Sequence, residues 1–387
     1  MSGADIMKNR RYKAAAVILA VLTMNGSVST AAQNGWVQEN NNWCYYDNSG
    51  NKVTDEWKES NGGWYYLGGD GYMLKSTLIE EDDDYYYVNS SGMMVKSQWR
   101  TVPNEDREED EPEVWWYYFR DNGKAWKQTG SNLSLKSIKK ANGTTCKYIF
   151  DDEGRMQFGW VNDNGERVPE DDAYKEATYY CGDNGDGAVA SNTWARVILE
   201  DEVDDNGDTR VEWLYLGSNG KKTVGVFRTI NGKKYGFNDD GEMLRGLYKL
   251  KTSGSKIEEA EKILEEGDLP EKDDPWDVYY FSEGSQYGTL QTGNQTIRLD
   301  GEKFNFTFRS NGIGLNGISD GYIYKKGRKL EADSDLKYEP ATCDGKEYLV
   351  NTSGKIMKNK KNLKDGNDVY YCTDKSGVIT YSGTEKQ

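Results

Sequence analysis

The chain has 387 residues and carries 49 Lys and Arg against 65 Asp and Glu, which gives a formal net charge of −16. This acidity disfavours binding to nucleic acid or to an anionic membrane, because both are polyanions. Histidine is absent, which excludes Ser-His-Asp and Cys-His nucleophilic sites and His-ligated zinc. Hydrolysis by paired carboxylates needs only Asp and Glu, so composition does not exclude it.

Residues 1–32 have the features of an export signal. Basic residues between Lys8 and Lys13 precede a short apolar run over 14–24, and small residues follow up to Ala32. The apolar run is too short to span a bilayer comfortably. We therefore predict a signal peptide over 1–32 and a secreted protein with no membrane span after signal removal.

The remaining chain is poor in aliphatic residues and rich in rings and glycine. Hydrophobic residues make up 36% of the sequence, whereas it contains 43 Gly, 28 Tyr and 12 Trp. Such a composition favours a thin stack of hairpins joined by tight turns, in which each layer buries its rings against the next layer.

An aromatic cluster followed by a polar turn and a glycine recurs along the chain. The units over 43–50, 64–71 and 85–92 end at glycines spaced by 21 residues, and copies with spacings of 21 or more continue to Gly377. In each unit the alternating rings predict a strand, and Asn-Ser-Gly or Gly-Asp-Gly predicts a tight turn. A short apolar return segment follows the turn.

These units predict a mostly β fold. One hairpin of this size is unstable alone in water, so we expect a solenoid of stacked β-hairpin repeats of about 21 residues. Longer acidic inserts before some aromatic strands predict projecting loops, at 104–113, 166–176, 200–208 and 255–277. One short helix is expected near 255–267, where Ser255 and Glu258 resemble a capping box and apolar residues share one helical face.

The units around Gly35-Trp36, Trp64-Tyr65-Tyr66 and Gly71-Tyr72-Met73 resemble the cell-wall-binding or choline-binding repeats of Gram-positive bacteria. The related glucan-binding repeats are similar. The resemblance implies a non-catalytic protein that holds choline on wall teichoic acid, or glucan, in shallow sites between consecutive hairpins. Aromatic faces suit such a ligand, because a quaternary ammonium donates no hydrogen bond and is held by cation–π attraction.

The resemblance is uneven along the chain. Apart from Trp276, every Trp lies between positions 36 and 213. We therefore expect aromatic hairpin repeats competent for ligand binding over 33–244, and degenerate repeats with the inserted short helix over 245–387. The expected ligand-binding residues are Trp36, Trp43, Trp57, Trp64, Tyr66, Tyr87 and Trp99, with Met73 and Met94 closing the sites. The alternative for each ring is packing between hairpins, since half of every strand must face inward.

The remaining expectations concern chemistry and partners. Cysteines such as Cys44 lie in aromatic clusters and are expected to be free and buried, although Cys343 and Cys372 are near enough in sequence to form a bridge. No cofactor or metal site is expected, and no enzyme, because repeats occupy the span that a catalytic domain would need. The expected partner is wall teichoic acid or an extracellular polysaccharide, held noncovalently at the cell wall or outside the cell. The alternative is a surface adhesin or matrix protein whose repeats and acidic loops bind a protein.

Overall fold

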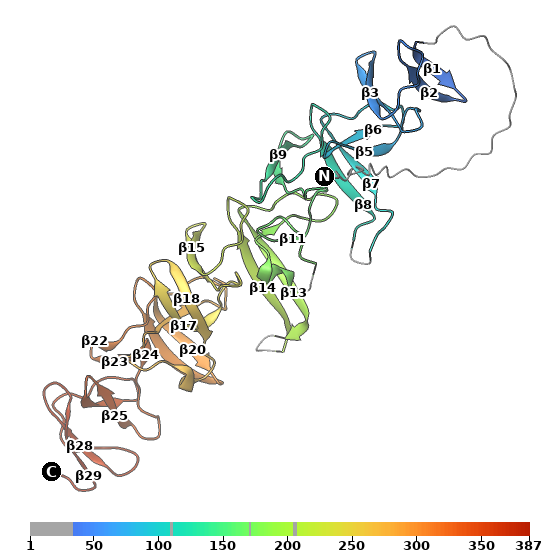
Figure 1. Cartoon of the computed structure of the whole chain (residues 1–387). Helices are drawn as coiled ribbons and strands as arrows, with labels where there is room; N and C mark the ends of the chain where they lie inside the picture. Colours follow the sequence, from blue (N-terminus) through green and yellow to red (C-terminus); the bar gives the residue numbers. More distant parts are fainter. Residues whose placement is uncertain (1–33, 109–110, 170–171, 204–206) are drawn as a thin grey trace, which may run out of the picture. The chain divides into compact units, whose positions relative to one another are not determined.

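The computed structural model describes residues 34–108, 111–169, 172–203 and 207–387. The predicted signal peptide, residues 1–32, lies outside the described residues. The described chain consists mainly of β-hairpins (Figure 1), which confirms the predicted mostly β fold. It divides into two compact units, Met1–Ser191 and Asn192–Gln387, which we describe separately.

The first unit is a series of two-stranded antiparallel sheets, each formed by strands that follow one another in the chain. The strands are β1 (Gly35–Glu39), β2 (Asn42–Tyr46), β3 (Glu56–Ser60), β4 (Gly63–Leu67), β5 (Thr77–Glu81), β6 (Asp84–Val88), β7 (Gln98–Pro103), β8 (Val114–Phe119), β9 (Lys136–Lys139), β10 (Thr145–Tyr148), β11 (Trp160–Val161) and β12 (Tyr179–Tyr180). A short helix, α1 (Ala173–Glu176), lies between β11 and β12.

Backbone hydrogen bonds join each hairpin of the first unit to the preceding one. The residue two positions after a turn glycine donates its N–H to a carbonyl of the previous aromatic strand. The donor–acceptor pairs are Met73 to Trp43 at 2.7 Å, and Met94 to Trp64, Ala125 to Tyr85 and Met156 to Trp116 at 2.8 Å. The predicted stacking of hairpin repeats is therefore present in the described part of this unit.

The turn glycines permit this stacking for two reasons. Gly92 has φ +85°, a conformation that costs a residue with a side chain free energy. A Cβ at this position would also lie 2.7 Å from the Met73 sulfur. Gly123 repeats the arrangement with Met94, where the corresponding distance is 2.5 Å. The turn of one repeat thus receives the methionine of the repeat before it.

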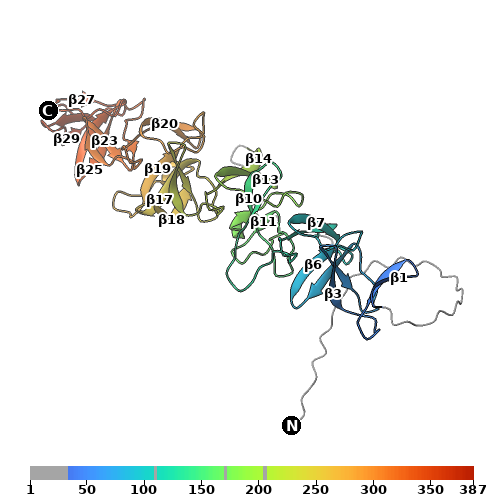
Figure 2. The ribbon, with the colours of Figure 1, turned by 90° about the horizontal axis from the view of Figure 1, so that it is seen from above.

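The second unit contains larger sheets. Its strands are β13 (Thr193–Val203), β14 (Thr209–Leu216), β15 (Val226–Ile230), β16 (Lys233–Phe237), β17 (Gly246–Ser253), β18 (Lys256–Lys262), β19 (Asp277–Phe281), β20 (Gly293–Leu299), β21 (Glu302–Phe308), β22 (Gly317–Ser319), β23 (Tyr322–Lys325), β24 (Arg328–Lys329), β25 (Tyr338–Cys343), β26 (Lys346–Asn351), β27 (Leu363–Lys364), β28 (Tyr370–Thr373) and β29 (Ile379–Gly383). Two five-stranded sheets have the orders β16-β15-β18-β17-β19 and β20-β21-β24-β23-β22, and β17, β18 and β19 lie together in Figure 2.

The boundary between the two compact units differs from the predicted boundary between ligand-competent and degenerate repeats. The predicted change lies between residues 244 and 245, and the first five-stranded sheet contains strands from both sides of this position. The structural boundary is instead at Ser191 and Asn192. The assignment of 33–244 as the ligand-competent half remains a prediction.

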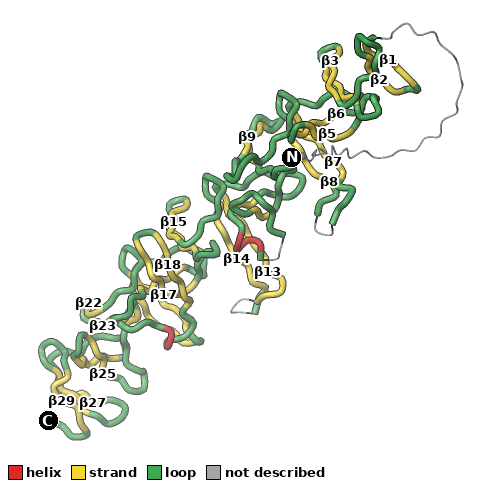
Figure 3. Tube along the Cα trace, viewed as in Figure 1, coloured by secondary structure: helices red, strands yellow, loops and turns green. Residues whose placement is uncertain are grey.

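The helix predicted over 255–267 is wrong in its position. Most of this segment is β18, drawn as a strand in Figure 3, and a 3-10 turn, η1 (Glu266–Asp268), follows it. Cross-strand ion pairs with β17 explain the difference: Lys249 pairs with Glu261 and Lys251 with Glu259, each at 2.8 Å. These pairs and the backbone ladder with β17 prevail over a weak helical pattern.

The described chain is stabilised by a succession of small clusters. Tyr66, Ile79 and Val88 form one such cluster in the first unit. All five cysteines are free, and four of them are buried, which confirms the prediction of free thiols. Burial raises the pKa of Cys181 to about 12, so its thiol is unreactive at neutral pH. Within the described ranges, no helix is long and apolar enough to cross a bilayer.

Candidate ligand-binding sites

The first candidate site, site A, consists of Trp36, Trp43, Tyr65 and Met73. Trp36 comes from β1, Trp43 from β2 and Tyr65 from β4 of the next hairpin, and Met73 follows the next turn. These side chains line an open groove of about 440 Å³. Consecutive hairpins must therefore be stacked for the site to exist.

The rings of site A form walls with exposed faces. The Trp36 and Tyr65 rings meet edge to face, with centroids 5.6 Å apart, and Trp43 is 39% exposed. Such faces attract a cation without requiring a hydrogen bond from it. The buried Nε1 of Trp36 has no hydrogen-bond partner among the described residues, which costs about 1–3 kcal/mol. A ligand oxygen that reached this N–H would recover that free energy.

Site B repeats site A 21 positions later with Trp57, Trp64, Tyr86 and Met94. The Trp57 and Tyr86 rings have centroids 5.3 Å apart, and Trp64 is exposed like Trp43. Trp57 Nε1 donates to Glu81 Oε2 at 2.7 Å, which places a carboxylate beside the rings. Negative charge at this position favours a cationic ligand.

Site C carries the same residue types as Trp99, Trp116, Tyr148 and Met156. Trp99 meets Tyr148 at 4.9 Å between centroids. Tyr148 and Met156 are each only 2% exposed, so site C is more closed than sites A and B. The same ring positions are present, but less of their surface is available to a ligand.

The position between sites B and C is filled by its own packing. Leu78 stands where the other sites have the first Trp, and Ala125 stands where they have Met. Tyr87 packs here, with its centroid 6.1 Å from that of Phe119. Tyr87 packs against a hydrophobic cluster of buried residues that includes Phe119, whose side chain is fully buried. This copy is therefore better explained as structure than as a binding site.

Site D lies in the second unit and consists of Trp194, Trp213, Tyr235 and Met243, with Tyr287 at its rim. These five side chains line a cavity of about 210 Å³. Trp194 meets Tyr235 at 5.1 Å between centroids and at 67°, close to the geometry of site A. Met243 donates its N–H to the Trp213 carbonyl at 2.9 Å, as Met73 does to Trp43.

The next copy in the second unit has a lysine in place of the exposed ring. Phe227, Tyr279 and Leu290 occupy the positions of Trp36, Tyr65 and Met73, and Lys234 occupies that of Trp43. Lys234 Nζ lies 4.5 Å from the centroid of the Phe227 ring. The chain's own ammonium therefore faces the ring that would face a ligand cation.

The structure brings most of the predicted site residues together. Trp36, Trp43 and Met73 meet in site A, Trp57, Trp64 and Met94 meet in site B, and Trp99 belongs to site C. Two assignments need correction. Tyr66 is 0% exposed in the cluster with Ile79 and Val88, and Tyr87 packs in the closed copy. Strand alternation explains the first case, since Tyr65 faces the site and its neighbour Tyr66 faces the core.

Several lining residues were not predicted. In the first unit these residues are Tyr65, Tyr86, Trp116, Tyr148 and Met156, and no residue of site D is among the predicted ones. One signal could have found site D: the intervals from Trp213 to Tyr235 and to Met243 equal those from Trp43 to Tyr65 and to Met73. Burial raises the pKa of Tyr86, Tyr148 and Tyr235 above the ordinary tyrosine value, so these phenols stay neutral at physiological pH.

The comparisons with known proteins match these repeats. A model of the choline-binding repeat matches residues 53–99, and a model of the cell wall binding repeat matches 34–52, 116–125 and 227–243. The chain carries choline-binding and cell-wall-binding repeats. The matches include the hairpins that supply Trp36, Trp57 and Tyr235. Over the parts of the chain that the structure describes, no group of three or more Cys, Asp or Glu residues could hold a metal ion.

One curated relative is glucosyltransferase-S of Streptococcus mutans serotype c (strain ATCC 700610 / UA159), which is 30% identical over 266 residues. The match covers 67% of this chain and 16% of that protein, so the chain spans a small part of its relative.

Among solved structures, choline binding protein F of Streptococcus pneumoniae is 20% identical, with a TM-score of 0.41 over 91% of this chain and 100% of that chain. The modular autolysin LytC of Streptococcus pneumoniae is 18% identical, with a TM-score of 0.42 over 84% of this chain and 52% of that chain.

Proposed function

We propose that the chain is a secreted, non-catalytic protein that holds a choline-substituted cell-wall polymer or a glucan between its aromatic hairpins. One observation carries this proposal: two Trp, a Tyr and a Met recur in the same order at sites A, B, C and D. Each set joins consecutive hairpins, and sites A and D open as cavities. Recurring sites suit a polymer whose substituent also recurs.

Choline on a wall polymer fits these sites best. Each cation–π contact contributes about 0.5–1 kcal/mol when exposed and about 2 kcal/mol when desolvated, so one site binds weakly. Several weak sites on one chain bind a repeating polymer much more tightly, because the first contact raises the local concentration of the next substituent. Such binding would attach the protein noncovalently to the wall. Glucan is the second ligand class, since sugar rings also pack on aromatic faces.

A binding assay on purified cell walls tests this proposal. The full chain is incubated with walls whose teichoic acid carries choline, with walls grown without choline, and with insoluble glucan. We expect retention on the choline-containing walls and release by millimolar choline. Retention on glucan alone would assign the glucan alternative. Failure to bind either polymer would refute the proposed function, and release of soluble wall fragments would refute the non-catalytic part.

A protein-binding adhesin is the second candidate, and the long hairpin of β13 and β14 favours it. β13 has 11 residues and carries Ile198 and Val203, which are 48% and 69% exposed. Exposed aliphatic side chains on this hairpin offer apolar surface that a protein partner could bury. Replacing Ile198 by serine should weaken binding to an immobilised extracellular-matrix protein and spare binding to walls. Equal retention of both activities would argue against this function.

A further inference from the structure

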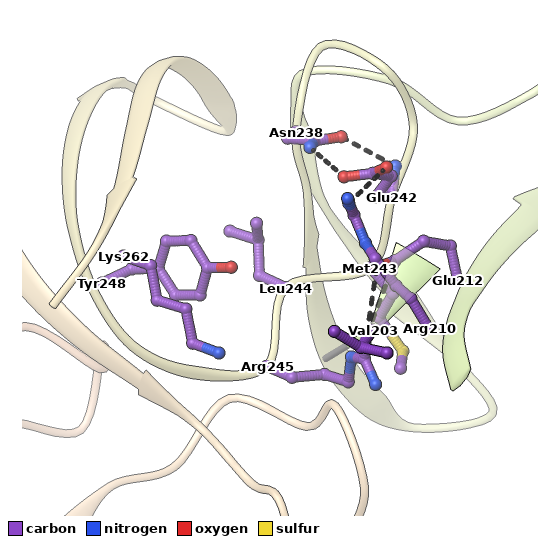
Figure 4. Close-up of a pocket in the computed structure, with 10 residues that line it drawn as sticks. All are labelled: Val203, Arg210, Glu212, Asn238, Glu242, Met243, Leu244, Arg245, Tyr248 and Lys262. Atoms are coloured by element: carbon purple, nitrogen blue, oxygen red, sulfur yellow. Dashed lines mark hydrogen bonds and ion pairs between the residues drawn. The ribbon is translucent and has the colours of Figure 1, made fainter. Parts of the chain in front are cut away.

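A second cavity in the second unit is lined mainly by charged side chains (Figure 4). We call it the polar pocket, and its volume is about 260 Å³. Its polar lining residues are Arg210, Glu212, Asn238, Glu242, Arg245, Tyr248 and Lys262. It adjoins site D, because Met243 lines both cavities.

Ion pairs hold the walls of the polar pocket in place. Arg210 donates from Nε to Glu212 at 2.8 Å and from Nη2 to Glu242 at 3.1 Å. Arg245 donates from Nη2 to Glu212 at 3.1 Å, and Asn238 donates to Glu242 at 2.9 Å. Burial alone would lower the pKa of Arg210, but these carboxylates raise it above its ordinary value. The donors and acceptors are therefore fixed before any ligand arrives.

The fold of the repeat does not require these charges. The corresponding positions of the first repeat carry Asn40, Asn42, Tyr72 and Lys75 in place of Arg210, Glu212, Glu242 and Arg245. Yet the hairpins stack through the same backbone bond in both repeats, at 2.7 and 2.9 Å. Glu212 is only 5% exposed, and desolvating a carboxylate is costly. A costly feature that stacking does not need points to a ligand.

We propose that the polar pocket binds a neutral sugar ring. An anion would meet Glu212 and Glu242, and a cation would meet Arg210, Arg245 and Lys262, so a charged ligand of either sign meets like charge in the lining. A sugar hydroxyl both donates and accepts, and can bond to a carboxylate and a guanidinium together. Tyr248 adds a ring on the wall opposite Glu242 in Figure 4. The volume lies just below the range of about 300–1,000 Å³ that suits drug-sized ligands, which fits one ring.

The polar pocket and site D are neighbours, because Met243 lines both. Arg245 of the pocket donates a hydrogen bond to the hydroxyl of Tyr287, which lines site D. A glycopolymer could therefore place a cationic substituent in site D and a neighbouring sugar in the polar pocket. This combined mode rests on the proposed function, whereas sugar binding by the pocket alone does not.

Saturation-transfer NMR on the full chain tests the sugar site. The probes are isomaltotetraose, maltotetraose and tetra-N-acetylchitotetraose, each up to about 20 mM, with choline chloride titrated separately and inorganic phosphate added as a competitor. The test variant is Glu242→Gln, which keeps the side-chain shape but removes the charge. Its matched control is Glu202→Gln, because Glu202 pairs with the same Arg210 at 2.7 Å but does not line the pocket.

We expect at least one sugar to bind and Glu242→Gln to weaken its binding about tenfold or more, the effect of one charged hydrogen bond. Glu202→Gln should leave sugar affinity unchanged, and neither variant should alter choline affinity. If Glu242→Gln fails to fold, Tyr248→Leu takes its place. Binding of no sugar, equal loss in both glutamate variants, or competition by phosphate would overturn the sugar site. Absence of choline binding in a wild-type protein that binds a sugar would count against the choline part of the proposed function and leave the sugar site standing.

Discussion

Replacing Trp43 by alanine removes one wall of site A and leaves the packing of its hairpin nearly intact. Trp43 is 39% exposed, whereas Trp36 packs against Tyr45 and Tyr65 at 5.5 and 5.6 Å between centroids. The variant should therefore fold like the wild type. Loss of one cation–π face costs about 0.5–2 kcal/mol, so choline affinity at site A should fall by about 2- to 30-fold.

Site-resolved NMR of the indole N–H groups measures this effect, because each Trp contributes its own resonance. During a choline titration of the Trp43→Ala protein, the Trp36 signal should shift only at higher choline concentrations. The Trp57 signal, which reports site B, should titrate as in the wild type. An unchanged Trp36 titration in a wild type that binds choline would refute the assignment of site A. A parallel loss at Trp57 would indicate that the substitution acts through folding.

Three further changes test other features. Lys234→Trp replaces the chain's own ammonium by the Trp ring that sites A, B, C and D have at this position, so equilibrium dialysis should find one more choline bound per chain. An unchanged number of bound cholines would contradict the correspondence between Lys234 and Trp43. Gly92→Ala adds backbone strain and a clash with Met73, so its melting temperature should fall more than that of Gly62→Ala, where a Cβ meets nothing within 4 Å. The buried thiol of Cys181, with its pKa raised to about 12, should resist a thiol reagent at pH 8 until the protein is unfolded, and rapid native labelling there would contradict its burial.

The repeat and its turns could be predicted from the sequence because their causes are local. A glycine at positive φ and alternating rings determine a hairpin wherever they occur. Binding sites are harder to predict, because the fold brings their residues together from different hairpins. Trp194 is far from Trp213 in the chain because β13 and β14 are long, yet pairing places Trp194 opposite Tyr215. Proximity in sequence was therefore a poor guide to site D.

The choice between neighbouring rings depends on strand register. Tyr65 and Tyr66 are chemically alike, but the first faces site A and the second packs against Trp57, with centroids 5.1 Å apart. A shift of one residue exchanges the two faces, and composition does not determine the register. The helix prediction for 255–267 is wrong for a related reason. The structure of this segment depends on pairing with its partner strand β17 and not on its own sequence pattern.

Ligand binding and hairpin stacking are coupled in this architecture. Site A takes Trp36 and Trp43 from one hairpin and Tyr65 from the next, and Met73 closes it while contacting the turn at Gly92. A ligand bound only to the stacked state stabilises it by about 1.4 kcal/mol per site at ten times its Kd. Isolated hairpins of this size are marginal in water, so this contribution is large relative to the stability of one repeat. The same residues that bind the polymer therefore also join one repeat to the next. A ligand bound at one site favours the stacked state of its hairpins, and the neighbouring sites need the same stacking to form.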